Sequence, residues 1–166
     1  MPDLAWWLQN FKRSAFRLEC LPEYSVPQEA EWFAAFKQDG SLPHLSPEND
    51  SWLRLVITSH SAGRFMQRVR LVSAPLSDYE RFELALFPPS VEAGEDIRIM
   101  SGAATPMTSD FWLFDGEVVI LLHYDGQGRF LRTEQAGDVV PYRRQRDLAL
   151  EHSIPLAEYT ARAARD

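Results

Sequence analysis

The chain has 166 residues, a formal net charge of −7 and an apolar residue content of 45%. This length and apolar content suit one domain, residues 1–166, with a sizeable core, and they argue against a disordered chain. The acidic charge argues against direct binding to nucleic acid, because the phosphates would repel it. No apolar run approaches the roughly 20 residues that span a membrane, and we expect a cytoplasmic protein.

Two adjacent tryptophans, Trp6 and Trp7, stand in the N-terminal segment 1–10, which we expect to be weakly structured. They serve either as a clip onto the domain or as a contact for a partner. Residues 16–21 then alternate apolar and polar side chains, which is typical of a strand. A helix follows, with Ser25 as its cap and Pro27 in its first turn, and Gly40 ends it.

The middle of the chain predicts a βαβ unit preceded by a helix. Asp50 caps that helix, whose apolar face carries Leu53, Val56, Ile57 and His60 at helical spacing. Residues 65–72 and 97–100 are predicted strands. Between them, Ser77 and Glu80 form a capping box for a helix over 78–87, which Pro88 and Pro89 stop.

The last third predicts an antiparallel meander and two helices. Asp115–Gly116 separates two β-rich runs, 111–114 and 117–124, and so indicates a two-residue hairpin turn. A strand over 129–133 follows. Asp138 caps a helix over 142–152, in which Arg143 and Asp147 are spaced to pair, and Pro155 begins a final helix.

Together these elements predict an α/β (α+β) fold. The segment 65–100 has the form of one βαβ crossover, which favours two parallel strands, whereas the later strands form an antiparallel meander. A mixed sheet with helices packed on it satisfies both. The predicted core consists of Trp32, Phe33, Phe36, Leu53, Val56, Val69, Leu71, Phe82, Leu86, Phe111, Leu113, Val119 and Leu121.

His123 and Asp125 form the main candidate for acid–base chemistry, because they lie two apart at the end of a predicted strand. Asp115 and Glu83 are further catalytic candidates. The structural alternative, which we favour, is that Asp125 caps a turn and His123 packs at the sheet edge. The acidic residues around Glu83 are more ordinarily a solvated helix face than a Mg²⁺ site.

Metal and cofactor motifs are missing from the sequence. The histidines do not show metal-ligand spacing, and the one cysteine, Cys20, forms neither an internal disulfide nor a zinc site and is expected as a small buried hydrophobe. We therefore predict no metal and no cofactor. Phosphate-binding, nucleophile-elbow and kinase motifs are also missing.

Several runs resemble an uncharacterised family of small actinobacterial proteins that are often encoded beside helix-turn-helix regulators. The runs are residues 16–19, 29–32, 79–83, 93–98, 110–115 and 122–125. This resemblance covers residues 11–159 and implies a regulatory role without a transferable catalytic residue. A weaker resemblance is to the phospholipase D fold, as a catalytically silent relative: its motif would start at His123, but Asp125 stands in place of lysine and Phe130 in place of aspartate.

Our leading hypothesis is a non-catalytic regulatory or partner-binding domain. Its partner would be a protein, such as a helix-turn-helix regulator or a member of a toxin–antitoxin-like module. The candidate contact residues are Trp6, Trp7, Arg143 and Arg144, whose rings and guanidinium groups suit a protein surface. The alternative is a small enzyme around His123 and Asp125. The identity of the partner, any substrate and self-association stay open.

Overall fold

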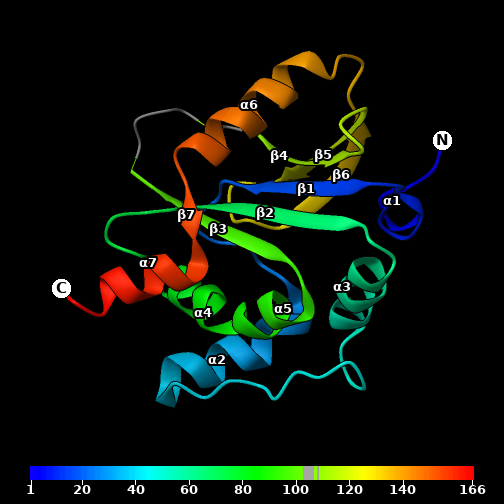
Figure 1. Cartoon of the computed structure of the whole chain (residues 1–166). Coiled ribbons are helices and arrows are strands. Elements are labelled where there is room, and N and C mark those ends of the chain that lie inside the picture. Colours follow the sequence, from blue (N-terminus) through cyan, green and yellow to red (C-terminus); the bar gives the residue numbers. More distant parts are fainter. Residues whose placement is uncertain (103–106, 108) are drawn as a thin grey trace.

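The computed structural model describes residues 1–102, 107 and 109–166, and a seven-stranded mixed sheet runs through it (Figure 1). The strand order is β6-β5-β4-β1-β2-β3-β7. The strands are β1 (Ser14–Glu19), β2 (Phe65–Val72), β3 (Asp96–Ser101), β4 (Asp110–Phe114), β5 (Val118–Tyr124), β6 (Phe130–Gln135) and β7 (Ile154–Pro155).

The pairing confirms the predicted mixed α/β sheet. β2 and β3 are parallel across the βαβ crossover, and β4, β5 and β6 form the antiparallel meander. Two pairings were not predicted: β1 is parallel to β2, and the short β7 is antiparallel to β3. β1 therefore lies at the centre, where it joins the parallel strands to the antiparallel strand β4.

Helices cover both faces of this sheet (Figure 1). One face carries α6, and the other carries α2 to α5 and α7. The helices are α1 (Leu4–Asn10), α2 (Ala30–Asp39), α3 (Ser51–Ser61), α4 (Asp78–Leu86), α5 (Pro88–Ala93), α6 (Val140–Glu151) and α7 (Leu156–Ala163), with a 3₁₀ turn at Pro27–Glu29. Within the described ranges, none of these helices has the length and apolar character needed to cross a bilayer.

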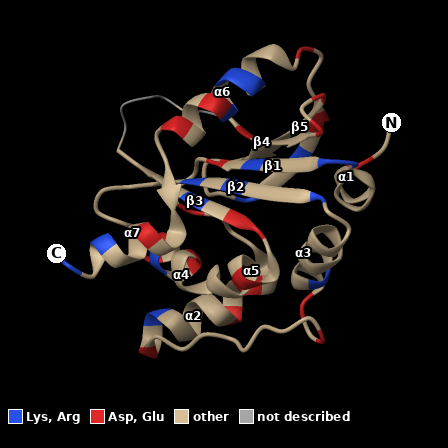
Figure 2. Ribbon diagram, in the orientation of Figure 1, with Lys and Arg blue, Asp and Glu red and all other residues tan. Residues whose placement is uncertain are grey.

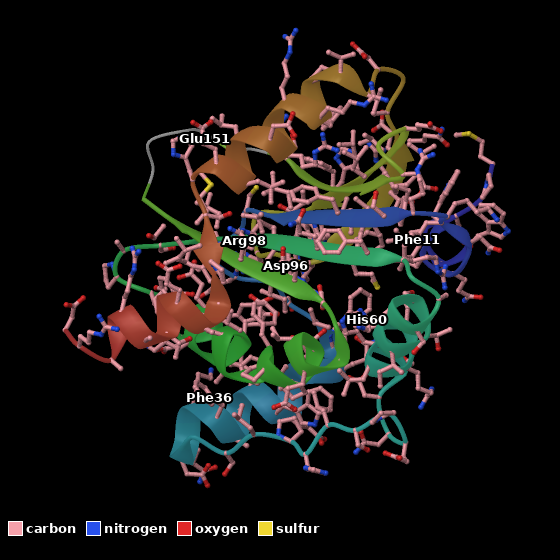
Figure 3. The ribbon with its side chains drawn as sticks, viewed as in Figure 1. Phe11, Phe36, His60, Asp96, Arg98 and Glu151 are labelled. Atoms are coloured by element: carbon pink, nitrogen blue, oxygen red, sulfur yellow. The ribbon has the colours of Figure 1, made fainter. Side chains whose placement is uncertain are left out.

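The face under α6 is an ordinary apolar core. Phe16 and Leu18 of β1 pack there with Phe111 and Leu113 of β4, and Ala149 of α6 covers them. Of the predicted core, Leu53, Val56, Val69, Phe82, Phe111, Leu113 and Val119 are buried, whereas Trp32, Phe33, Phe36, Leu71, Leu86 and Leu121 are half-buried. Phe36, labelled in Figure 3, reaches from α2 toward α4, where its ring lies 5.6 Å from that of Phe82.

The N-terminal segment differs from the prediction of weak structure, because residues 4–10 form the helix α1. The Asp3 side chain caps it by accepting a hydrogen bond from the Trp6 backbone N–H at 2.8 Å. The Trp7 ring stacks on Phe114 at 5.7 Å between centroids, which ties the helix to β4. Trp7 therefore fastens the N-terminal segment to the domain, which is the first of the two roles predicted for the tryptophan pair.

One capping prediction was wrong. Ser25 does not cap α2, because a 3₁₀ turn intervenes: Val26 is the N-cap of that turn and Glu29 is the N-cap of α2, and neither side chain makes a capping hydrogen bond. The predicted end of the helix over 78–87 is confirmed, because α4 ends at Leu86, just before Pro88. The structure adds the short helix α5, which begins at Pro88, where the fixed φ of proline suits a first turn.

The apolar face of α3 is rotated from the predicted one. The buried residues are Leu53, Val56 and Ser59, whereas Ile57 and His60 are exposed. Figure 3 labels His60, whose ring leaves no room for a Cβ at Gly94 after α5. In α6, Arg143 does not pair with Asp147, since its Nε donates to the Gly116 carbonyl at 2.6 Å and Asp147 pairs with Arg146.

The β4–β5 connection contains Asp115 and Gly116, as predicted, and both residues have positive φ, 54° and 71°. Phe114 pairs with Val118, so three residues connect the strands instead of the predicted two. The Asp115 carboxylate accepts hydrogen bonds from the backbone N–H groups of Lys12, Arg13 and Ser14 at 2.6 to 3.1 Å. This aspartate therefore fastens the start of β1 to the hairpin.

Candidate functional site

Charged side chains occupy the centre of the sheet face that α2 to α5 cover. We call this set the charged face: Arg17 and Glu19 of β1, Arg68 and Arg70 of β2, and Asp110 of β4. In the parallel register Arg17 lies beside Arg68, and Glu19 beside Arg70. Because side chains alternate along a strand, the residues between them form the apolar face under α6.

Each arginine of the charged face is paired with a carboxylate. Arg17 Nη2 lies 3.0 Å from Asp110 Oδ2, and Arg70 Nε lies 2.8 Å from Glu83 Oε2. Arg68 has two partners, which are described next. Figure 2 shows the acidic and basic segments of the strands and of the helices beneath them.

Arg68 bridges two strands through two carboxylates. Its Nη1 donates to Glu19 at 2.7 Å and its Nε donates to Glu95 at 2.8 Å. Glu95 lies just before β3 and accepts further hydrogen bonds from Trp52 Nε1, at 3.2 Å, and from the Ser90 hydroxyl. One guanidinium thereby connects β1, β2, the start of β3 and two helices.

Burial and neighbouring charge set the ionisation of these groups in opposite directions. Burial alone would raise the pKa of Glu19, but Arg68, Arg17 and Arg70 outweigh it and lower that pKa to about 2. Burial, together with repulsion from Glu19, raises the pKa of Glu83 to about 8 despite its pairing with Arg70. Two carboxyl groups of one network are thus driven apart in acidity, which is a property that functional sites share with structural ion-pair networks.

Tyrosines border the charged face where β1 ends. The Tyr24 hydroxyl donates to Asp110, and Arg17 Nη2 lies 3.4 Å from the Tyr124 hydroxyl. The Tyr79 hydroxyl donates to Glu29 at 2.8 Å. Burial raises the pKa of Tyr124 to about 12, so its hydroxyl keeps its proton at neutral pH.

A pocket of about 330 Å³ opens onto the charged face, and we call it the tryptophan pocket. Arg17, Glu19 and Arg68 line its sheet side. The remaining wall contains residues of the covering helices and loops and one strand residue: Glu29, Trp32, Leu45, Asp50, Trp52, Leu53, Leu86, Phe87, Pro89, Ser90 and Trp112. Three of the five tryptophans of the chain therefore meet at one pocket.

The rings of this pocket are held in place by neighbouring groups. Trp52 Nε1 donates to the Ser90 hydroxyl at 3.1 Å, and its ring lies 5.9 Å from that of Trp112. The Arg68 guanidinium lies over both Trp52, at 5.4 Å, and Phe87, at 5.1 Å. Rings fixed by such bonds form a pocket wall that exists before a ligand enters.

A neighbouring pocket of the same volume, about 330 Å³, lies between residues 23–26 and α2. It shares Glu29 with the tryptophan pocket, and no member of the charged face lines it. Its other polar lining residues are Glu23, Tyr24, Ser25, Lys37, Tyr79 and Gln127. The tryptophan pocket is therefore the better candidate site, because apolar walls and convergent charged groups meet there.

The proposed catalytic residues lie in separate places. His123 and Asp125 line a common pocket of about 290 Å³ at the end of β5. Glu83 of α4 pairs with Arg70 of the charged face, whereas His123 lies beside Arg132 on the other face, so the sheet separates them. Asp115 is at the opposite end of the β4–β5 hairpin.

The contacts of His123 and Asp125 match the structural alternative. His123 Nε2 lies 3.0 Å from Glu134 Oε2 on the neighbouring strand β6. Asp125 accepts hydrogen bonds from the backbone N–H groups of Gln127 and Arg129 and from Arg129 Nε at 2.7 Å. Glu83 is also not on a solvated helix face: it is buried, as is Glu80.

The proposed contact residues lie near the β4–β5 hairpin. Trp7 packs on Phe114, and Arg143 binds the Gly116 carbonyl, so both have structural contacts. Trp6 is 46% exposed and Arg144 is exposed. Cys20 is half-buried, and burial raises the pKa of its thiol to about 12.

The sequence prediction missed the charged face and the tryptophan pocket. The alternation of residues 16–19 is typical of a strand with one solvated face, and nothing in that pattern indicates that its charged side chains are covered by helices. The available signal was the βαβ crossover, because parallel strands are covered on both faces. Among the described residues, no group of three or more His, Cys, Asp or Glu is placed to hold a metal ion.

Comparison with known proteins identifies a family. The family model described as a domain of unknown function, DUF6879, matches residues 2–161. A search of curated proteins finds no match.

Proposed function

From the premise that the chain belongs to the DUF6879 family, we propose that it is a non-catalytic regulatory domain that binds a small molecule in the tryptophan pocket. Occupancy of the pocket would control association with a protein partner. The observation that carries the proposal is the meeting of three tryptophans with two ion-paired arginines, Arg17 and Arg68, at one pocket.

The energetics of the charged face support a role beyond stability. Taking paired charges out of water is expensive, and apolar residues of similar volume often stabilise a buried site equally well or better. The apolar face under α6 shows that these strands support such a core. Retaining three arginines on the other face therefore favours a function that needs charge beside the pocket.

The nature of the partner rests on the resemblance of the sequence to proteins encoded beside helix-turn-helix regulators. A DNA-binding regulator fits an acidic domain of net charge −7 that does not itself suit DNA. The actinobacterial origin, the toxin–antitoxin-like setting and the resemblance to a catalytically silent phospholipase D fold rest on the sequence resemblance alone and stay predictions.

The experiment compares wild type with Trp32→Ala and a matched control, Trp6→Ala. Trp32 lines the pocket, whereas Trp6 lies in α1. Each protein is purified from native cells, its circular dichroism is checked, and the small molecules released by denaturation are analysed by mass spectrometry. We expect a compound enriched in wild type and in Trp6→Ala but absent from Trp32→Ala. Equal compound content in all three, or none in wild type, would refute the proposal.

An acid–base enzyme around His123 and Asp125 is the alternative. Only the shared pocket at the end of β5 supports it, since Asp125 already binds two backbone N–H groups. In a cellular complementation assay, His123→Ala is expected to keep function and Trp32→Ala to lose it. The reverse result would favour the enzyme, because a general acid–base group contributes about 10²–10⁴ in rate.

A further inference from the structure

The tryptophan pocket has a surplus of negative charge. Glu19, Glu29 and Asp50 line it together with Arg17 and Arg68. Both arginines are already neutralised, Arg17 by Asp110 and Arg68 by Glu19 and Glu95. Of the three lining carboxylates, only Glu19 takes part in these ion pairs. The arginines therefore do not offset the charges of Glu29 and Asp50.

Two of these carboxylates have an oxygen free for a ligand. Glu19 is only 6% exposed, and Arg68 bonds to its Oε1, while among the described residues its Oε2 has no hydrogen-bond donor. Glu29 receives the Tyr79 hydroxyl on Oε2. Burial raises the pKa of Glu29, and a nearby cation would favour its charged form. Glu19 Oε2 and the second oxygen of Glu29 therefore keep lone pairs that a hydrogen-bond donor of a ligand can use.

The aromatic walls suit positive charge as well. Ring faces attract cations, and tryptophan does so most strongly. Arg68 already lies over Trp52 and Phe87 within 5.4 Å, so two rings of this pocket already pack against a cation. Trp32 and Trp112 line the same space, and the structure records no cation over their rings among the described residues.

We propose that the tryptophan pocket binds an organic cation: an ammonium or amidinium group carried on a flat apolar body. The positive group would lie toward Glu19 and Glu29, and the body would lie among the tryptophans. The volume of about 330 Å³ is near the lower end for ligand pockets, so the body is about one ring with a short arm. This inference rests on the proposed function, since it names the class of the same ligand.

An anion fits the pocket less well. It would approach two arginines whose charges are already balanced, and it would lie beside two further carboxylates. A neutral ligand would leave Glu19 Oε2 without a charged donor. The cation is the class that satisfies both the free carboxylate oxygens and the rings.

The test uses three probes of similar shape: phenethylammonium, phenylacetate and phenethyl alcohol. Each is titrated into the ¹⁵N-labelled full chain, and the five indole N–H signals are followed by NMR. We expect phenethylammonium to shift the signals of Trp32, Trp52 and Trp112. Trp6 and Trp7 lie in α1 and serve as internal controls whose signals stay in place.

Two variants identify the charge that matters. Glu29→Gln is expected to weaken phenethylammonium binding about tenfold, since a charged hydrogen bond contributes on the order of one factor of ten or more. Glu31→Gln is the matched control: Glu31 is exposed in the first turn of α2 and does not line the pocket, and the affinity of this variant should equal that of wild type.

Equal or stronger shifts with phenylacetate or phenethyl alcohol would overturn the cation class while leaving a small-molecule pocket in place. Equal affinities of Glu29→Gln and Glu31→Gln for phenethylammonium would also overturn the cation class. If none of the probes moves the three pocket signals, the organic-cation inference is refuted. The extraction experiment with Trp32→Ala then decides the proposed function independently.

Discussion

Replacing Asp110 by asparagine separates charge from shape in the charged face. The Asp110 and Arg17 side chains are 4% and 7% exposed and lie 3.0 Å apart. Asp110 also accepts a hydrogen bond from the Cys20 backbone N–H at 3.1 Å, through Oδ1. An asparagine oxygen can keep that bond, but an amide in place of Oδ2 removes the ion pair with Arg17 and the acceptor of the Tyr24 hydroxyl. The buried Arg17 guanidinium then keeps Glu19 as a nearby carboxylate but has lost its directly paired one.

The expected loss of unfolding free energy comes from breaking the buried ion pair between Asp110 and Arg17. Removing one partner of a buried ion pair destabilises a protein by about 3–5 kcal/mol. A domain of this size has roughly 5–15 kcal/mol of unfolding free energy in total. Asp110→Asn should therefore remove a large share of the stability of this chain, even though the side chain changes by one atom.

The measurement is a urea unfolding curve followed by far-ultraviolet circular dichroism, with Arg17→Met and the double variant completing a cycle. We expect the double variant to be more stable than Asp110→Asn alone, because methionine removes the unpaired charge. A cost below about 1 kcal/mol for Asp110→Asn, or additive costs in the double variant, would show that this pair behaves like an exposed one.

Two further predictions concern the hairpin and the pH dependence. Gly116 has φ 71° and an open surrounding, so Gly116→Val should lose roughly 1–2 kcal/mol from backbone strain alone, and a urea midpoint equal to that of wild type would contradict this. The lowered pKa of Glu19 means that its contribution to stability is present above its usual value of 4.5 and is lost as the pH falls toward about 2. Glu19→Gln should therefore flatten the acid side of the stability–pH curve, and an unchanged slope in that range would count against the pairing with Arg68.

The parts of the fold that follow from local patterns were predictable. The capping box of Ser77 and Glu80 forms with both of its bonds, and Asp50 caps α3. The βαβ crossover and the meander were also predicted from strand patterns and turn residues. These features depend on residues close in sequence, where propensity and capping chemistry act directly.

The pairing of β1 with β2 and the charged face were not predictable in the same way. Residues 14–19 and 65–70 are far apart, and nothing local shows that they lie side by side. An arginine in an alternating strand has the same pattern whether its face meets water or helices. Arg68 is understood only once Glu19, Glu95 and Trp52 are brought to it from three other elements.

The sequence predicted a candidate catalytic site at His123 because catalytic groups are often found at strand ends and turns. The turn there uses Asp125 for its own backbone N–H groups, and this demand is as common as catalysis. Trp32 was predicted as a core residue for another reason. A large apolar ring at helical spacing packs inward whether it meets protein or a ligand. Sequence pattern gives the direction of such a ring but not what fills the space before it.

The proposed pocket predicts that the two faces of the sheet divide stability from binding, and this division is open to measurement. Variants under α6, such as those at Leu113 or Val119, remove apolar contacts and leave the pocket charges unchanged. Variants at Arg68 alter a pair with Glu19, a pair with Glu95 and the stacking on Trp52 together. If the charged face were only a costly way to hold the sheet, loss of stability and loss of ligand would rise in proportion on both faces. A pocket that depends on charge instead predicts loss of the ligand on the charged face beyond what stability explains, because a ligand responds to the groups it touches.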